Sequence, residues 1–319
     1  MFHFDRGLKL TKADLAIDIR RRQPRAFVSH AHSDHIARHQ LTLCTPETAK
    51  LYCLRLGRRE TVELPYYQPL EWGGLRLTTF PAGHCLGSAM LLAEDDDLSL
   101  LYTGDFKLTE SATVPRADPP RADILVIEST YGDPQYRHMP RDEAVGRLVS
   151  LVREILHRDA TPVIQAYALG KSQEVTRLLT RHGIGVLQHT EIHQISRVYE
   201  QCGVELGPYE LFRGQGKTGY AVIVPPGRRQ RGAFDRLNRV ETIAVTGWAT
   251  DPTAKYRLGV DHAIPLSDHA DFDDLCRTIE RVAPRETYCT HGPETFVDWL
   301  RKGGVNAFRL GAASPSQLF

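Results

Sequence analysis

The chain has 319 residues, of which 41% are hydrophobic and 25% charged, and its formal net charge is +1. These values are ordinary for a soluble globular protein, and the length allows one large domain or two compact ones. No apolar run approaches the roughly 20 residues that span a bilayer, and the first residues lack the pattern of a signal peptide. These patterns argue against membrane-spanning and exported classes, so we expect a cytoplasmic protein that does not contact a membrane.

Neither the cysteines nor the net charge indicates a ligand. The six cysteines form no Cys-X-X-Cys pair, so we expect reduced thiols rather than a zinc ribbon. A net charge near zero is no footprint of nucleic-acid binding, although the arginine clusters at 20–25 and 228–231 could form a basic groove. Solvated surface is the alternative interpretation of each cluster.

The first part of the chain alternates short apolar or β-favouring stretches with polar residues and glycines. We expect strands at 26–28, 75–80, 99–103 and 124–127. Each of these strands runs into a polar residue or a glycine. The candidate functional side chains therefore stand at strand ends.

A different pattern begins near Asp142, where apolar residues recur at helical spacing. The expected elements are helices at 142–158, 171–182 and 190–201 and strands at 162–167, 220–224 and 242–245. This alternation predicts a separate α/β unit. Further along, we expect a helix containing Phe272 and Val282, a strand at 287–290, a helix after Pro293 and a strand at 305–310.

The simplest organisation is a discontinuous first domain that the middle α/β unit interrupts. We place the first part of this domain at residues 1–139 and its second part at 259–319. The inserted domain then occupies residues 140–258.

The most specific feature is a His-X-His-X-Asp-His run directly after the first predicted strand, formed by His30, His32, Asp34 and His35. The chain turns there, so the four side chains can converge on one point. Imidazole and carboxylate donors suit zinc, manganese or iron. So short a loop cannot easily offer four donors to one tetrahedral ion, but it can serve two adjacent ions. A histidine-rich surface loop is the alternative, although three of only 14 histidines fall in these six positions.

Two further candidate ligands each follow a predicted strand and a glycine, namely His84 and Asp105. Either one alone could be a loop residue with a purely structural role. With the first run they complete a pattern in which His84 joins His30 and His32, while Asp105 bridges two ions. A bridging carboxylate holds two metals about 3.5–4 Å apart, the spacing that phosphoryl transfer uses.

This set of residues resembles the ligand pattern of the metallo-β-lactamase superfamily, and the resemblance covers the whole chain in order. It implies a four-layer αββα sandwich with its metal site at one edge of the sheets. It also implies two divalent metal ions, for which zinc is the first expectation and manganese the alternative.

Three later segments resemble motifs of the β-CASP nucleases, a branch with an inserted α/β domain. They contain Glu128 at a strand end, His269 in a Ser-Asp-His-Ala-Asp run, and His291 after a strand. The resemblance implies that His291 completes the second metal site with Asp34, His35 and the bridging carboxylate.

The same resemblance implies a catalytic group made of His269, Glu128 and Asp34. His269 would give a proton to the oxygen that leaves the phosphorus atom. Glu128 would orient His269 and raise its basicity. Structural roles are the alternatives, with Glu128 capping a loop and His269 standing next to a helix start.

Four segments are similar to those of bacterial DNA ligase-associated exonucleases, namely 128–132, 166–173, 266–271 and 290–292. This similarity implies a DNA exonuclease of DNA repair, with nucleic acid as substrate and a DNA ligase or other repair proteins as partners. An RNA-processing endo- or exoribonuclease, like those of mRNA 3′-end processing, is the alternative. Thioesterase- or lactamase-type hydrolases lack the Glu128–His269 pair, and a decayed binding subunit would have lost ligands.

Lys171 and Ser172 follow a predicted strand and Gly170 and begin a predicted helix, where backbone N–H groups and the helix dipole favour an anion. The first glycine of a Walker A loop is absent. We therefore expect Lys171, Ser172 and Tyr131 to contact substrate phosphate, with an ordinary strand–helix turn as the alternative. Trp248 could stack on a base, with core packing as its alternative.

Overall fold

The structure, a computed structural model, describes residues 1–4, 7–227, 234 and 236–311. The arginine cluster at 228–231 lies outside these residues. The chain divides into two compact units, which we call unit 1 (residues 1–110, 114–137 and 269–319) and unit 2 (residues 111–113 and 138–268). Among the described residues, no helix combines the length and the apolar character that crossing a bilayer requires.

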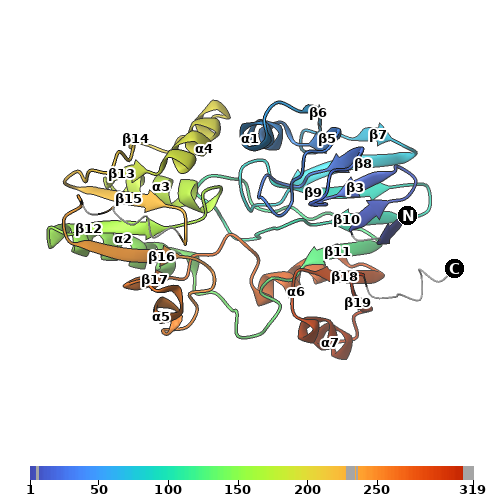
Figure 1. The fold of residues 1–319 in the computed structure, drawn as a ribbon. Helices are drawn as coiled ribbons and strands as arrows, with labels where there is room; N and C mark the ends of the chain where they lie inside the picture. Colours follow the sequence, from blue (N-terminus) through green and yellow to red (C-terminus); the bar gives the residue numbers. More distant parts are fainter. Residues whose placement is uncertain (5–6, 228–233, 235, 312–319) are drawn as a thin grey trace. The chain divides into compact units, whose positions relative to one another are not determined.

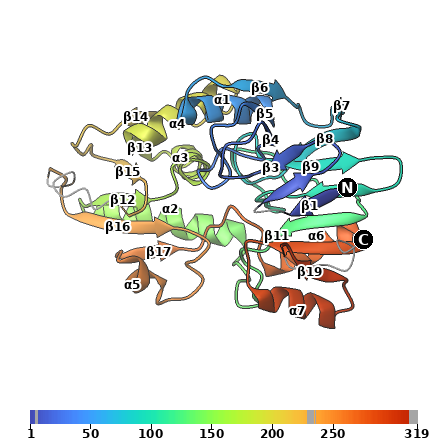
Figure 2. The same ribbon diagram turned by 45° about the vertical axis from the view of Figure 1, so that its right-hand side comes forward.

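Unit 1 contains two sheets (Figures 1 and 2). The first has six strands in the order β1 (Phe2–Phe4), β2 (Leu8–Leu10), β3 (Leu15–Ile17), β4 (Arg25–Phe27), β5 (Leu41–Cys44) and β6 (Glu60–Glu63). The second has seven strands in the order β19 (Ala307–Arg309), β18 (Glu286–Thr290), β11 (Ile124–Glu128), β10 (Ser99–Tyr102), β9 (Ala89–Glu94), β8 (Leu75–Pro81) and β7 (Leu70–Trp72).

The alternation of side chains along the strands builds the layers of unit 1. On β11, Ile124 and Val126 belong to the core between the two sheets, whereas Leu125 and Ile127 belong to a core shared with helices. A strand buried on both faces reads as a continuous apolar run, which is why the sequence predicted it.

Helices cover the outer face of each sheet. Helix α1 (Pro46–Leu56) packs on the first sheet through a small core that includes Tyr52. Helices α6 (Phe272–Val282) and α7 (Glu294–Lys302) pack on the second sheet. The four layers confirm the predicted αββα sandwich.

Unit 2 is an α/β unit around one parallel sheet (Figure 1). Its strands follow the order β14 (Tyr209–Leu211), β13 (Gly185–Gln188), β15 (Tyr220–Val224), β12 (Thr161–Gln165), β16 (Val240–Val245) and β17 (His262–Ile264). Its helices are α2 (Arg141–His157), α3 (Lys171–Arg181), α4 (Thr190–Gln201) and α5 (Ala254–Leu258). Helices α2 and α3 bury their apolar faces in the main core of this unit.

The C-terminal end of unit 2 differs from the insertion expected at 140–258. Strand β17 pairs in parallel with β16, with Ile243 opposite His262. Residues 259–268 therefore pack with unit 2, and the chain returns to unit 1 at His269. The inserted domain with its predicted limits stays a prediction.

The core of unit 2 generates the first testable prediction. Leu148 on α2 is fully buried in that core, so Leu148→Ala should lower the free energy of unfolding by about 2–5 kcal/mol. The matched control is Arg147→Ala, because Arg147 is exposed and pairs only with Glu143 one turn away; its effect should stay within about 0.5 kcal/mol. Urea denaturation of both variants measures the difference. Equal midpoints would contradict the assigned packing of α2.

Candidate metal centre

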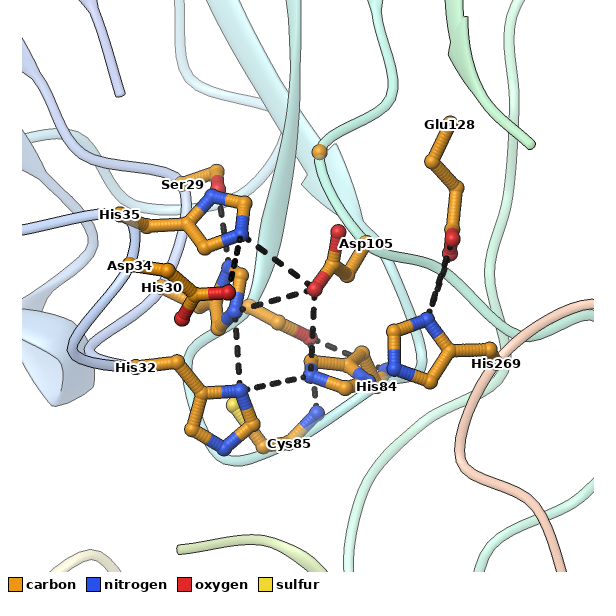
Figure 3. A network of polar contacts seen from close by, with 12 residues as sticks. Ser29, His30, His32, Asp34, His35, His84, Cys85, Asp105, Glu128 and His269 are labelled. Carbon is orange, nitrogen blue, oxygen red and sulfur yellow. Dashed lines mark hydrogen bonds and ion pairs between the residues drawn. The ribbon is translucent and has the colours of Figure 1, made fainter. Parts of the chain in front are cut away.

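The candidate ligands of unit 1 meet because their strands end at one edge of the second sheet. Strands β8 and β10 both pair antiparallel with β9, while β10, β11 and β18 pair in parallel. All four carboxyl ends therefore point to the same edge, where His84, Asp105, Glu128 and His291 lie at or just beyond them. His30 follows β4 of the facing sheet and reaches the same group (Figure 3).

The first donor set consists of His30, His32, His84 and Asp105, whose ligand atoms all lie within 4.8 Å of one another. The Nδ1 atom of His32 lies 3.1 Å from Nε2 of His30 and 3.0 Å from Nε2 of His84. The Oδ2 atom of Asp105 lies 3.5 Å from Nε2 of His30 and 3.9 Å from Nε2 of His84. Ligands about 2.0–2.1 Å from a tetrahedral zinc ion lie roughly 3.3 Å apart, so this set fits one such ion.

The second donor set is more open and shares Asp105 with the first. Nε2 of His35 lies 3.4 Å from Oδ2 of Asp105 and 3.9 Å from Oδ2 of Asp34. The ring centroids of His35 and His291 are 5.7 Å apart. Asp34 and His291 are exposed, whereas His35 and Asp105 are buried. One carboxylate oxygen thus faces both sets, which is the arrangement that a bridging ligand requires.

The chain turns sharply at Gly83 and Gly104, directly before the candidate ligands His84 and Asp105. Gly83 and Gly104 have φ values of +76° and +54°, in the left-handed region that favours glycine. A Cβ atom on Gly83 would lie 2.3 Å from the carbonyl oxygen of Lys107, and one on Gly104 would lie 2.8 Å from Cβ of Ser29. These turns set the directions in which His84 and Asp105 leave their strands.

Asp18, which no sequence motif indicated, positions His35 of the second donor set through the ring nitrogen that faces away from Asp105. Its Oδ2 atom accepts hydrogen bonds from Nδ1 of His35 at 2.8 Å and from the hydroxyl of Tyr102 at 2.9 Å. Its Oδ1 accepts the backbone N–H of Ser29 at 2.8 Å. A carboxylate on the far nitrogen fixes the orientation of a metal-binding imidazole. Asp18 directly follows the apolar stretch 15–17, so the strand-end signal could have identified it.

Burial and neighbouring charges shift the pKa values of three residues of the donor sets. Burial, followed by the charge of His35, holds the pKa of His30 well below its usual value, so this ring is neutral and offers a lone pair. Burial opposes charge on His35, but Asp105 and Asp18 outweigh it and hold the pKa of His35 well above the usual value. Burial would raise the pKa of Asp105, yet His35 dominates and keeps it well below the ordinary range. The shared carboxylate is therefore anionic.

His269 and Glu128 form the predicted pair beside the donor sets (Figure 3). Nδ1 of His269 lies 3.0 and 3.1 Å from the two carboxylate oxygens of Glu128. Glu128 is buried and also accepts the backbone N–H of Phe106 at 2.8 Å and the hydroxyl of Thr130 at 2.6 Å. The ring centroid of His269 is 4.6 Å from that of His84. Glu128 therefore fixes a histidine ring in contact with a candidate ligand.

Two of the residues expected to contact phosphate, Lys171 and Ser172, are buried within unit 2. Lys171 is 1% exposed, and its Nζ lies 3.4 Å from Asp268, within unit 2. The Ser172 hydroxyl donates to the carbonyl oxygen of Tyr167 at 2.7 Å. Both side chains are thus buried in this structure, and their contact with substrate phosphate stays a prediction. Tyr131 is buried with its ring 6.0 Å from that of His269.

Comparison with known proteins found related sequences, although no family model matches the chain. A probable DNA ligase of Opitutus terrae is 39% identical over 99% of this chain and 31% of its own length. Subunit 3 of the cleavage and polyadenylation specificity factor of Dictyostelium discoideum is 36% identical over 76% of this chain and 38% of its own length. The 5′ exonuclease Apollo of Gallus gallus is 29% identical over 81% of this chain and 56% of its own length. The chain thus spans less than two thirds of each of these relatives.

A solved structure shows the same fold. It is a protein of unknown function from Enterococcus faecalis, with a TM-score of 0.58 and 18% identity. The match covers 84% of this chain and 75% of that one.

The hydrogen bond from His35 to Asp18 generates a prediction about metal affinity. Asp18→Ala should weaken metal binding about 10–100-fold, because the imidazole loses the carboxylate that orients it. Asp18→Asn keeps an acceptor and should restore part of the affinity. Asp14→Ala, at an exposed carboxylate, is the control, and Asp105→Ala should lose metal outright. Zinc titration against a chelating dye measures each affinity, and wild-type affinity in Asp18→Ala would refute the positioning role.

Proposed function

Because the chain belongs to the β-CASP branch of the metallo-β-lactamase superfamily, we propose that it is a divalent-metal-dependent nuclease that hydrolyses DNA. The observation that carries the proposal is the meeting of two donor sets around Asp105 with a histidine that Glu128 holds. Donor sets for two adjacent cations suit cleavage of a phosphodiester, whose oxygens carry the charge that such cations neutralise.

The proposed ligands are the members of the two donor sets. His30, His32, His84 and Asp105 would hold one ion. Asp34, His35 and His291 would hold the other together with the shared Asp105. We propose zinc as the metal, with manganese as the alternative. When bound, such ions lower the pKa of water to about 7 and stabilise negative charge on phosphate oxygens.

His269 is the proposed general acid. Since its Nδ1 is engaged with Glu128, proton exchange with a substrate oxygen would take place at Nε2. Glu128 stabilises the proton-carrying ring and is itself fixed by Phe106 and Thr130, so the ring cannot turn away. Asp34, the exposed carboxylate of the second donor set, completes the proposed catalytic group.

DNA is the proposed substrate because a relative named as a probable DNA ligase matches 99% of the chain. Similarity to the 5′ exonuclease Apollo supports cleavage from a strand end, so we propose an exonuclease. We further propose that it acts in DNA repair together with a DNA ligase. An RNA-processing nuclease is the second candidate, since a subunit of the cleavage and polyadenylation specificity factor is 36% identical.

The substrate is tested with end-labelled single strands of DNA and RNA of one sequence. After treatment with a chelator, the protein should be inactive, and zinc or manganese should restore cleavage. A DNA exonuclease degrades the DNA strand progressively from one end, whereas an endoribonuclease cuts the RNA at internal positions. The proposal of a nuclease fails if metal-loaded protein cleaves neither strand.

His269→Ala separates chemistry from metal binding. The variant should keep its metal content, because His269 belongs to neither proposed ligand set, but its turnover should fall about 10²–10⁴-fold. Mass spectrometry measures the metal content per chain, and a cleavage assay on the preferred strand measures turnover. Asp105→Ala is the comparison variant, which should lose both metal and turnover. A His269→Ala protein that cleaves at the wild-type rate would disprove the general-acid assignment.

A further inference from the structure

A second polar pocket lies in unit 1 at the edge opposite the metal centre. It has a volume of about 520 Å³ and is lined by Arg22, His39, Gln40, Arg58, Arg59 and Glu60. Strands β4, β5 and β6 run parallel, and these residues precede them or stand at the start of β6. The pocket is therefore at the amino ends of these strands, whereas His30 follows the carboxyl end of β4. Neither donor set contributes to it.

The pocket concentrates positive charge that no carboxylate neutralises directly. Within the described part of the chain, Arg22, Arg58 and Arg59 form no ion pair. Arg59 donates from Nη2 to the carbonyl oxygen of Leu56 at 3.1 Å, which caps the end of α1. Its Nε is buried and has no hydrogen-bond partner among the described residues. Helix capping therefore explains one nitrogen of Arg59 and leaves another unsatisfied.

His39 adds a second unsatisfied donor. Its Nδ1 accepts the backbone N–H of Gln23 at 3.2 Å, so the proton of the neutral ring must be on Nε2. The residue is 2% exposed, and Nε2 has no partner among the described residues. Burial lowers the pKa of His39 to about 4, which keeps the ring in this neutral form at pH 7. His39 lines the pocket, and its ring keeps an N–H donor that has no partner among the described residues.

A buried donor without a partner is unfavourable, so two such donors in one pocket call for an acceptor. Solvation accounts for the exposed side chains of Arg22 and Arg58, but not for the buried nitrogens of Arg59 and His39. Donors converge here from three separate chain segments, as a tetrahedral oxyanion with several acceptor oxygens requires. Guanidinium groups match phosphate oxygens in pairs, which makes arginine the preferred side chain for such a ligand.

We propose that this pocket, formed by Arg22, His39, Arg58 and Arg59, binds a phosphoryl group remote from the metal centre. The group is the terminal phosphate of a nucleic-acid strand or that of a free nucleotide, since both present the same dianion. Glu60 on the pocket wall carries the single negative charge among the lining residues and leaves the arginines in excess. The proposal does not depend on the nuclease function, because the pocket shares no residue with the two donor sets.

The test measures phosphate binding by isothermal titration calorimetry on the metal-loaded full chain. The probes are inorganic phosphate, adenosine monophosphate, and one oligonucleotide with either a 5′-phosphate or a 5′-hydroxyl end. The Arg58→Gln, Arg59→Gln double variant should weaken binding of the phosphate probes at least tenfold. Arg21→Gln, which changes an exposed neighbour that does not line the pocket, should bind like the wild type. Circular dichroism of each variant establishes that it is folded.

Equal affinity of wild type and folded double variant for every phosphate probe would overturn the proposal, because any binding would then belong to another site. Absence of measurable binding by the wild type would overturn it as well. Tighter binding of the phosphorylated than of the hydroxyl-ended oligonucleotide, lost in the double variant, supports the pocket and identifies a strand end as the source. Equal binding of adenosine monophosphate and the phosphorylated strand supports it with a free nucleotide as the source.

Discussion

The candidate metal centre depends on one carboxylate, that of Asp105. Its Oδ2 atom lies within 3.5 Å of Nε2 of both His30 and His35, so it joins the two donor sets. Although burial opposes its ionisation, the neighbouring His35 keeps the pKa of this carboxyl well below its usual range. Gly104 makes this placement possible, since only a residue without Cβ fits against Ser29 at that turn. The second sheet then supplies the remaining groups from the ends of its parallel strands.

Much of the fold, and a full set of candidate ligands, could be predicted from the sequence. Ligands such as His84 were found because a strand that ends in a glycine and a polar residue leaves a local trace in the sequence. Long apolar strands and amphipathic helices leave the same kind of trace, as β11 and α2 illustrate. Strands of three residues, such as β1 and β14, were missed because their conformation depends on a partner far away in the chain.

The burial of a side chain is the property that local sequence does not show. Lys171 and Ser172 have the composition of an anion-binding turn, yet the structure encloses both and gives them internal partners. Asp18 was overlooked because its contact with His35 has no motif, although its position directly after an apolar stretch was a signal that could have identified it. The arginine pocket was missed for a related reason, since its donors come from three segments that no spacing rule connects.

The pairing of β11 with β18 has a consequence for how the chain acquires its structure. Ser129 hydrogen-bonds to Thr290 across 161 positions, and residues 138–268 of unit 2 lie between these two strands in the sequence. During synthesis β11 therefore leaves the ribosome before its partner β18, and residues 138–268 leave it between the two strands. Contacts of such long range form late and slowly. A chain that ends before residue 269 would carry the His-X-His-X-Asp-His loop and still lack His269 and His291, so it could not assemble the complete candidate site.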